Sequence, residues 1–559
     1  MPAVQTYSSS GNPYIDSILG NIRWVPSDLT YSFPTSSIAY GSAYGDGETT
    51  KNFGSFNGTQ QAITRSALKL FASVSNLTFQ EAAGTGASSA DLRFAQSDAP
   101  GTAWAYFPTT DATGGDVWIN NSSRTYASPA KGNYAYLTIV HEIGHALGLE
   151  HAHEGNMPLS RDSMEYTVMS YRSYSGASID KGYANETWGY AQSLMMYDIA
   201  ALQHIYGANY GTNSGNTTYS WSPTTGKMLI NGVSQGTPGG NQIFLTVWDG
   251  GGTDTYNFTA YTTSLTINLR PGAWTITSQD QRAKLHWDGS KIAAGNIANA
   301  LLHQGDTRAL IENAYGGSAN DTIKGNVAGN DLRGNAGDDR LYGLSGNDVL
   351  IGGSGKDVLS GGAGTDIASY STAKAGVVAD LVTKANNRGD AAGDFYSSVE
   401  GLTGSSYNDT LFGSGSANQI KGGSGRDTLH GRSGNDVLNG GAGNDKLYGE
   451  GGKDLLIGGS GADIFVFSSS AHSRMSSADT IEDFHRGSDH IDLRDMDANT
   501  RLAGNQVFTF IGNNVFQGKA GELRFANGVA SGDTNGDKIA DFGINVAGLS
   551  AMSRSDFYL

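Results

Sequence analysis

The segment HEIGHALGLEH combines three histidines with a glutamate at spacings that suit a metal centre. On a helix, His141 and His145 are four residues apart and share one face, so both imidazoles can reach one metal ion. Glu142 stands beside His141, where its carboxylate can contact a metal-bound water. Gly148 lets the chain turn at the helix end and brings His151 back as a third ligand. Three imidazoles with an open water position indicate a catalytic zinc rather than a structural one.

A single HExxH motif has a real false-positive rate, and a single histidine in a helix is more often a core residue whose hydrogen bonds are satisfied. The extended motif, with Gly148 and His151, is far more specific. Downstream, YTVMSY places Met169 in a tight turn followed by Tyr171. Such a methionine turn after the long zinc motif defines the metzincins. Met169 alone would be interpreted as core filler; after this motif we interpret it as the hydrophobic floor beneath the metal. His153 lies off the motif, and we expect it at the surface.

A mixed α/β domain would position these residues. Apolar residues at helical spacing predict a helix over 59–75, a second that carries the histidines and ends near Gly148, and a third over 193–209 that stops at Gly207. The short strands predicted in this domain are LTFQEA, ADLRFAQ, TAWAYFP and GDVWINN.

A nine-residue repeat replaces helical periodicity in the second half of the chain. Asp or Asn recurs at every ninth position from Asp321 to Asp366 and again from Asp409 to Asp463, with residues 370–403 interrupting the period. Each unit is a Gly-rich hexad followed by a triplet with an apolar middle residue. We expect the triplet to be a short strand with that side chain inside. Two units would make one coil of a parallel β-roll, so that carboxylates eighteen residues apart stack on one edge.

Oxygen ligands in Gly-rich turns suit Ca²⁺, which takes six to eight of them. A low-complexity linker is the alternative, but a linker has no reason to lock its Leu and Ile phase to its Asp phase. One isolated copy, DGGGTDTYN, is a candidate for a separate ion, whereas DTNGDKIAD lacks the terminal Glu of an EF loop and is at least as well explained as a surface turn. The predicted calcium ligands are Asp249, Asp254, Asp321, Asp339, Asp348, Asp357, Asp366, Asp409, Asp427, Asp436, Asp445, Asp454 and Asp463.

Composition narrows the class of protein. The net charge of −17 argues against nucleic acid or an anionic membrane surface as the main partner. The chain has 79 Gly and no Cys, so disulfides and thiolate metal sites are excluded. No apolar run is long enough to span a bilayer, and the N-terminus lacks the features of a signal peptide.

At this point the sequence resembles the serralysin family, the metzincins with repeats-in-toxin (RTX) nonapeptides that Gram-negative bacteria secrete. The likeness covers nearly the whole chain, through LTYSFP, HEIGHALGLEH, TVMSY, YDIAALQHIYGAN, WDGGGTDTYNF, IENAYGGSANDTI and the final DFYL. It implies an α+β metzincin protease domain followed by an all-β domain with a parallel β-roll. Ala152 stands where the family usually has Pro, and the repeat array is longer than usual.

The resemblance implies a secreted zinc endopeptidase. Glu142 would act as general base, and Tyr171 would ligate zinc at rest and swing away to stabilise the oxyanion. TAWAYFP matches the edge strand that pairs with an extended peptide substrate. The C-terminus resembles an uncleaved signal for a type I secretion apparatus, so we expect an extracellular monomer with one zinc and several calcium ions, and a proteinaceous inhibitor as a candidate partner. The competing function is a calcium-dependent surface-layer or adhesion protein with a relic protease domain.

These patterns predict the organisation of the chain. The expected segments are an N-terminal segment and candidate short propeptide (1–25), the metalloprotease domain (26–210), a connecting β region (211–315), a first repeat block (316–369), the insert (370–403), a second repeat block (404–467) and a C-terminal β domain with the secretion signal (468–559).

Overall fold

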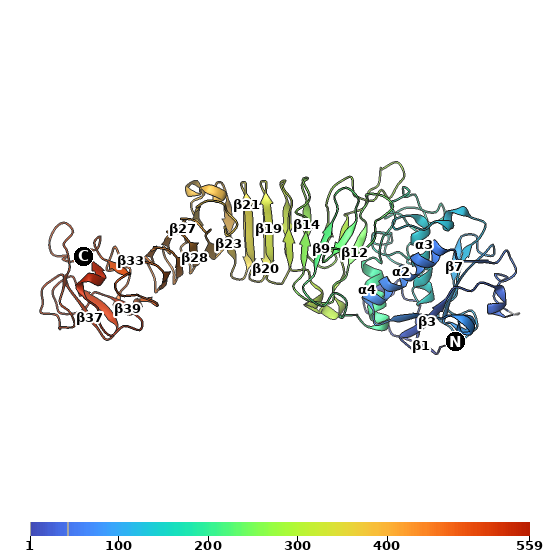
Figure 1. The fold of residues 1–559 in the computed structure, drawn as a ribbon, viewed down its shortest axis with the longest axis horizontal. Helices are drawn as coiled ribbons and strands as arrows, with labels where there is room; N and C mark the ends of the chain where they lie inside the picture. Colours follow the sequence, from blue (N-terminus) through green and yellow to red (C-terminus); the bar gives the residue numbers. More distant parts are fainter. Residues whose placement is uncertain (1, 42–43) are drawn as a thin grey trace. The chain divides into compact units, whose positions relative to one another are not determined.

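The computed structural model describes residues 2–41 and 44–559 and divides the chain into two compact units. The first extends to Asn313 and the second covers Ala314–Leu559. Figure 1 shows that the helices labelled α2, α3 and α4 belong to the first unit, whereas the second is built of strands.

Three helices of the first unit confirm the predicted ones. They are α2 (Gly58–Val74), α3 (Tyr134–Ala146) and α4 (Met196–Tyr206). The helix α2 begins at a capping box in which Asn57 and Gln60 exchange hydrogen bonds, and α4 stops at Gly207 with φ of 82°. A short helix, α1 (Pro13–Asp16), was not predicted; Asn12 caps it and Pro occupies its first position.

A mostly parallel sheet lies beside these helices, with strand order β5-β3-β6-β8-β7 and β4 paired to β6. The four strands expected from the sequence are all present in it, and β7 lies at the edge, antiparallel to β8. The bounds are β3 (Asp28–Ser32), β4 (Gly54–Ser55), β5 (Thr78–Glu81), β6 (Leu92–Ser97), β7 (Ala103–Ala105) and β8 (Val117–Asn120).

The core of this unit packs helices against the sheet and against each other. Phe71 of α2, Ile143 of α3 and Phe94 of β6 are all fully buried in one cluster. Burying such side chains stabilises the fold by about 1.5–3 kcal/mol each. The helix α3 is buried along nearly its whole length, so the histidines that it carries are held on a rigid element.

The rest of the first unit is built of short strands. The N-terminal pair β1–β2 is antiparallel, and β12, β16 and β15 form a three-stranded sheet. The bounds are β1 (Val4–Thr6), β2 (Ile22–Trp24), β9 (Thr218–Trp221), β10 (Met228–Ile230), β11 (Val233–Ser234), β12 (Leu245–Val247), β13 (Thr255–Asn257), β14 (Thr266–Asn268), β15 (Trp274–Thr275) and β16 (Ile297–Asn299).

The second unit is a parallel β-roll, as the nine-residue period predicts. Leu332 pairs in register with Leu350 in one sheet, and Leu341 pairs with Leu359 in the other, so one coil takes eighteen residues. The inward apolar position is fully buried in nearly every repeat. The strands up to the insert are β17 (Asn313–Tyr315), β18 (Thr322–Lys324), β19 (Asp331–Ala336), β20 (Arg340–Ser345), β21 (Val349–Ser354), β22 (Val358–Ala363) and β23 (Ile367–Ser369).

The insert interrupts one sheet of the roll, which ends at β25 before a separate sheet begins at β24, and leaves the other sheet continuous from β23 through β26 to β28. Strand β22 pairs in parallel with β25, and β23 pairs with β26, across the interruption in the sequence period. Beyond the roll, β37, β38 and β39 form an antiparallel meander. The remaining strands are β24 (Val378–Asp380), β25 (Phe395–Ser397), β26 (Gly401–Thr403), β27 (Thr410–Phe412), β28 (Gln419–Ser424), β29 (Thr428–His430), β30 (Val437–Ala442), β31 (Lys446–Tyr448), β32 (Leu455–Ser460), β33 (Ile464–Val466), β34 (Asp479–Ile481), β35 (His490–Asp492), β36 (Thr509–Phe510), β37 (Glu522–Ala526), β38 (Val529–Asp533), β39 (Phe542–Val546) and β40 (Phe557–Tyr558).

Candidate active site and calcium sites

Three histidines meet at the C-terminal end of α3. The Nε2 atoms of His141 and His145 are 3.1 Å apart, and Nε2 of His151 lies 3.2 Å from the first and 2.9 Å from the second. His141 and His145 are one helical turn apart, as the sequence motif requires. The predicted convergence of the three imidazoles is therefore present in the structure.

Hydrogen bonds on the far side of two rings set the tautomers. Nδ1 of His141 donates to the carbonyl oxygen of Val168 at 2.8 Å, and Nδ1 of His145 donates to that of Leu149 at 2.7 Å. Burial lowers the pKa of His141 to about 3 and that of His145 well below its ordinary value, so both rings are neutral. Lone pairs on Nε2 then face one another at close range, and a divalent cation between them fits this donor set.

Gly148 makes the turn that returns the third histidine. Its φ is +97°, and a Cβ there would collide with the carbonyl oxygen of Ile22. The backbone nitrogen of Leu149 bonds the carbonyl oxygen of Gly144 at 2.9 Å and closes the turn. A left-handed backbone and a close approach both require glycine at residue 148.

Met169 lies under the histidines. It is fully buried, and its sulfur would be 2.7 Å from a Cβ built on Gly144 of α3. Its backbone nitrogen bonds Oγ1 of Thr167 at 3.0 Å. This arrangement agrees with the interpretation of Met169 as a hydrophobic floor.

Asp198, which the sequence reasoning missed, anchors the turn that contains Met169. Its Oδ1 accepts from the hydroxyl of Thr167 at 2.5 Å, and its Oδ2 accepts from the backbone nitrogens of Val168 and Met195, both at 2.8 Å. Burial raises the pKa of Asp198 to about 7. The signal in the sequence was an aspartate at the start of a helix that is otherwise apolar, SLMMYDIAALQ.

Glu142 faces a small pocket that His141 also lines. The pocket measures about 210 Å³, and its lining includes Glu142, Tyr134, Thr138 and Tyr171. The Oε2 atom of Glu142 is buried without a hydrogen-bond partner among the described residues, and burial raises the pKa of this carboxyl to about 8. An unpaired carboxylate oxygen beside the His141 ring is suited to hold a water molecule and take its proton.

Tyr171 stands over the histidines. Its ring centroid is 4.4 Å from that of His151 and 5.7 Å from that of His141, and 37% of the residue is exposed. Burial of its hydroxyl raises its pKa to about 12, so it is a hydrogen-bond donor at neutral pH. His153 is not a surface residue as expected: its side chain is only 18% exposed, and its ring stacks on that of His151 at 5.4 Å. The turn after the zinc motif carries His153 back against Tyr171.

The aspartates of the nonapeptides form two stacks along the roll. The backbone nitrogen of Asp339 donates to Oδ1 of Asp357 at 2.8 Å, and that of Asp427 donates likewise to Asp445, eighteen residues on. The second oxygen of many of these aspartates is buried and unpaired among the described residues: Asp339, Asp348, Asp357, Asp366, Asp427, Asp436, Asp445, Asp454 and Asp463.

Such a row of oxygens is a donor set for calcium. Burial raises the pKa of Asp339 to about 8 and that of Asp357 to about 7, because the ionised forms lack compensation. A Cβ at Gly352 would collide with the unpaired oxygen of Asp357, so the glycine leaves this oxygen free to reach an ion. Bound calcium would satisfy the buried carboxylates.

Two predicted ligands differ from the rest. Asp409 accepts from Ser405 and Val377 through both of its oxygens, and Asp321 accepts from the backbone nitrogen of Gly317 at 2.7 Å. Both residues lie at the beginning of a repeat block.

The isolated upstream copy also brings its carboxylates together. Oδ2 of Asp249 accepts from the hydroxyl of Tyr219 at 2.6 Å, while Oδ2 of Asp254 is buried and unpaired in the part of the chain that the structure describes. Glu312 accepts from the backbone nitrogen of Asp254 at 2.7 Å and was not predicted. Burial raises the pKa of Asp249 to about 8.

Four further acidic residues extend the stacks beyond the regular repeats. Asp394 and Glu400 accept from the backbone nitrogens of Asp357 and Asp366, each at 2.9 Å, and thereby extend both stacks into the insert. Asp479 and Asp489 do the same for the last repeats. The nine-residue period did not predict these four residues, because they lie 25 to 37 residues after their partners instead of eighteen.

The loop DTNGDKIAD forms a closed turn. The carboxylate of Asp533 accepts from the backbone nitrogens of Gly536 and Lys538, and that of Asp541 accepts from Thr534. These bonds use the oxygens within the loop, in keeping with a structural turn.

Comparison with known proteins agrees with this architecture. The family model for matrixin matches residues 48–168, the model for the RTX calcium-binding nonapeptide repeat matches 333–368, and the model for the serralysin C-terminal region of peptidase family M10 matches 383–559. None of the helices in the described part of the chain is both long and apolar enough to cross a membrane. Fold and site thus define an α+β metzincin domain followed by an all-β RTX region.

The chain is serralysin-like. It is 35% identical to the metalloprotease AprA of Pseudomonas entomophila over 53% of its length, and 36% identical to serralysin A of Dickeya chrysanthemi over 54%. It is 33% identical to a serralysin of Proteus mirabilis over 54%. These alignments span only about 60% of each relative's own length: 59%, 59% and 60%. A matrixin domain implies a catalytic zinc ion, and RTX repeats bind calcium.

Proposed function

We propose that this protein is a zinc-dependent endopeptidase that cleaves extracellular proteins, with an RTX region stabilised by calcium. The observation that carries the proposal is the meeting of three neutral imidazoles, through Nε2, beside the unpaired oxygen of Glu142. His141, His145 and His151 would hold the zinc. When bound, zinc lowers the pKa of a water ligand and polarises the scissile carbonyl.

The residues of the chain supply the other steps. Glu142 holds the attacking water through Oε2, takes its proton and passes that proton to the leaving amine. Tyr171 donates its hydroxyl to the developing oxyanion; its pKa of about 12 keeps that proton in place at neutral pH. Gly148 and Met169 position the histidines.

The edge strand β7 gives the substrate its orientation. The pocket beside Glu142 includes Thr102 and Ala103, so a peptide paired to β7 would pass in front of the catalytic groups. Strand addition reads the substrate backbone, and we therefore propose broad side-chain specificity.

Secretion and assembly belong to the same proposal. Serralysin relatives and RTX repeats are typical of extracellular proteins. We infer export by a type I secretion apparatus, a monomer outside the cell, and a proteinaceous inhibitor as a partner. Extracellular calcium modules typically bind at about 10⁻⁴–10⁻³ M, so the repeats would remain unfolded at the far lower calcium level of the cytosol.

Casein digestion with and without a zinc chelator tests the enzyme function. Glu142→Ala should retain stoichiometric zinc and lose turnover, because the ligands remain while the base is gone. Full activity in the chelator, or in a zinc-loaded Glu142→Ala, would contradict the zinc mechanism, whereas no cleavage by the zinc-loaded parent would favour an adhesion protein with a relic protease domain. Circular dichroism of residues 316–559 during a CaCl₂ titration tests the calcium part; complete β signal in EGTA would contradict it.

A further inference from the structure

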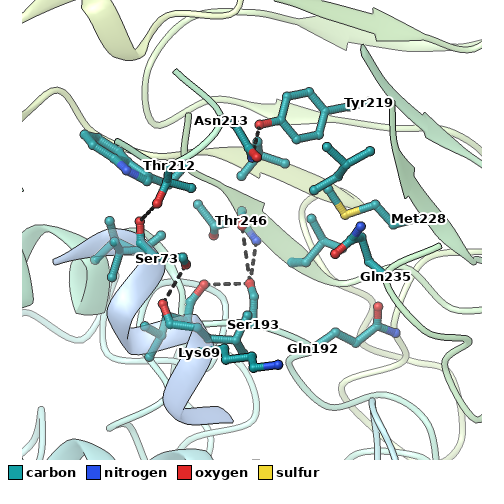
Figure 2. Close-up of a pocket in the computed structure, with 18 of the residues that line it drawn as sticks. Lys69, Ser73, Gln192, Ser193, Thr212, Asn213, Tyr219, Met228, Gln235 and Thr246 are labelled. Carbon is teal, nitrogen blue, oxygen red and sulfur yellow. Dashed lines mark hydrogen bonds between the residues drawn. The ribbon is translucent and has the colours of Figure 1, made fainter. Parts of the chain in front are cut away.

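A second cavity of the first unit lies apart from the catalytic pocket and shares none of its lining residues. Its volume is about 330 Å³, within the range of small-ligand sites, which runs from about 300 to 1,000 Å³. Helix α2 forms one wall, the segment before α4 another, and strands β9, β10 and β12 with neighbouring loops a third (Figure 2).

The body of this cavity is apolar. Leu70, Ile199, Ile230 and Val247 are among the side chains that line it. Trp248 contributes the largest ring and is 6% exposed. Such a lining favours a ligand with an aliphatic portion.

The polar groups of the walls satisfy one another. Ser193 accepts from the backbone nitrogen of Thr246 at 2.9 Å, and Thr212 donates to the carbonyl oxygen of Ser73 at 2.7 Å (Figure 2). Asn213 donates to the hydroxyl of Tyr219 at 2.9 Å. A peptide segment would bring amide and carbonyl groups that need partners, and these walls offer few, whereas an alkyl chain needs none.

The charges of the cavity are both positive. Lys69 and Lys131 belong to its lining, and no Asp or Glu does, although the chain has 53 acidic residues against 36 basic ones. Neither ammonium forms an ion pair with a described residue. Lys69 is exposed and lies at the same edge of the lining as Gln192 (Figure 2).

Lys131 is the less exposed member of the pair. It spends one of its three protons on the carbonyl oxygen of Gln235 at 2.9 Å. Burial lowers the pKa of Lys131, and no neighbouring charge opposes that effect. A half-buried ammonium without a counterion is unfavourable, and a bound anion would relieve this cost.

We propose that this cavity binds a single-chain aliphatic carboxylate, a fatty acid, with its chain between α2 and the strands and its carboxylate at Lys69 and Lys131. The apolar walls, the mutually satisfied polar groups and the two unpaired cations each point to this ligand class. Because the ligand would contact both the helix and the strands, its binding would also stabilise the first unit against unfolding.

Calorimetric titration of the zinc- and calcium-loaded protein with decanoate tests the proposal, in buffer free of excess calcium. Decan-1-ol and decylammonium are the matched probes, with the same chain and no negative charge. We expect decanoate to bind at least tenfold more tightly than either and to raise the melting temperature. Equal binding of decanoate and decanol, or no binding of decanoate, would overturn the proposal.

Variants locate the site. The double change Lys69→Met and Lys131→Met keeps the length of both side chains and should weaken decanoate at least tenfold while leaving decanol unchanged. Lys519→Met, an exposed lysine of the other unit, is the control and should bind as the parent does. Ile230→Trp should fill the cavity and abolish binding of both probes. Unchanged decanoate affinity in either the double variant or Ile230→Trp would place the ligand elsewhere and contradict the assignment. Casein cleavage in each variant reports on the protease separately.

Discussion

Oδ2 of Asp198 lies 2.8 Å from the backbone nitrogen of Val168, whose carbonyl oxygen lies 2.8 Å from Nδ1 of His141. A carboxylate on α4 is thereby linked through one peptide unit to a histidine on α3. The same carboxylate holds Thr167, which in turn bonds the backbone of Met169. Asp198 therefore fixes the orientation of a zinc-ligand candidate that it never touches.

Removing the carboxylate of Asp198 should destabilise the fold and weaken zinc binding by the three histidines. Asp198→Ala would leave three buried donors without acceptors, each costing about 1–3 kcal/mol. We expect a loss of unfolding free energy of at least about 3 kcal/mol and a zinc affinity that is about 10–100-fold weaker. Asp198→Asn can keep two of these hydrogen bonds, so it should lose less unfolding free energy and less zinc affinity. Denaturation and competition with a zinc chelator measure these effects; wild-type zinc affinity in a folded Asp198→Ala would contradict the link.

The contribution of Asp198 to the free energy of unfolding depends on pH, and the sign of this dependence can be predicted. Burial raises the pKa of Asp198 to about 7, above its ordinary value of 3.8, so the folded state holds the proton more strongly than the unfolded state. Its contribution to stability is full at low pH and declines as the pH rises from about 4 to about 7. The deficit of Asp198→Asn relative to wild type should therefore shrink by about 1 kcal/mol or more between pH 5 and pH 8. A deficit that stays constant over this range would show that the carboxylate is ionised throughout and contradict the prediction.

Tyr171→Phe should lower kcat and change KM much less. The variant loses one hydrogen-bond donor to the oxyanion, a change worth about 10²–10³ in rate. Tyr174→Phe is a suitable control because Tyr174 lies three residues further on and does not line the catalytic pocket. Steady-state kinetics on a peptide substrate distinguish the two. An unchanged kcat in Tyr171→Phe would remove this residue from the mechanism.

Gly148→Ala should be far more harmful than Gly176→Ala. Both glycines have positive φ, +97° and +84°, so each alanine would suffer backbone strain of about 1–2 kcal/mol. At Gly176 the Cβ would meet open space, whereas at Gly148 it would collide with the carbonyl oxygen of Ile22. We expect Gly176→Ala to retain activity and Gly148→Ala to lose zinc, as measured by metal analysis after gel filtration. Similar behaviour of the two variants would exclude the steric explanation.

Calcium binding to the roll should weaken in acid. Burial raises the pKa of Asp339 to about 8 and that of Asp357 to about 7, so protons and calcium compete for the same oxygens. The calcium concentration at the midpoint of folding, followed by circular dichroism, should increase at least severalfold from pH 8 to pH 6. A midpoint independent of pH would show that calcium does not compete with protons for these carboxylates.

The sequence predicted the parts of this protein that depend on local spacing. The fourfold spacing of His141 and His145 defines one helix face, and a strict period of nine defines the roll, so the structure confirms both. Four short strands of the first unit, β5 to β8, were also predicted from local sequence. Even the stop of α4 at Gly207 is a local signal.

What the sequence could not show depends on contacts between distant segments. Asp198 meets Val168 across 30 residues, and Asp394 takes its place in the aspartate stack 37 residues after Asp357. His153 is covered by Tyr171, which only the methionine turn brings near. The apolar cavity joins α2 to strands more than a hundred residues further along the chain, and no motif marks it.

The aspartate stacks give the roll a direction. In each rung the carboxylate that would bind calcium also accepts the backbone N–H of the aspartate one coil earlier, never the reverse. Backbone bonds run the other way, as from the nitrogen of Arg340 to the carbonyl oxygen of Asp321, so each coil is bonded to both neighbours as in a one-dimensional cooperative array. Asp479 and Asp489 accept from Asp454 and Asp463 and close the last coils, and order gained in any coil can spread to its neighbours on both sides.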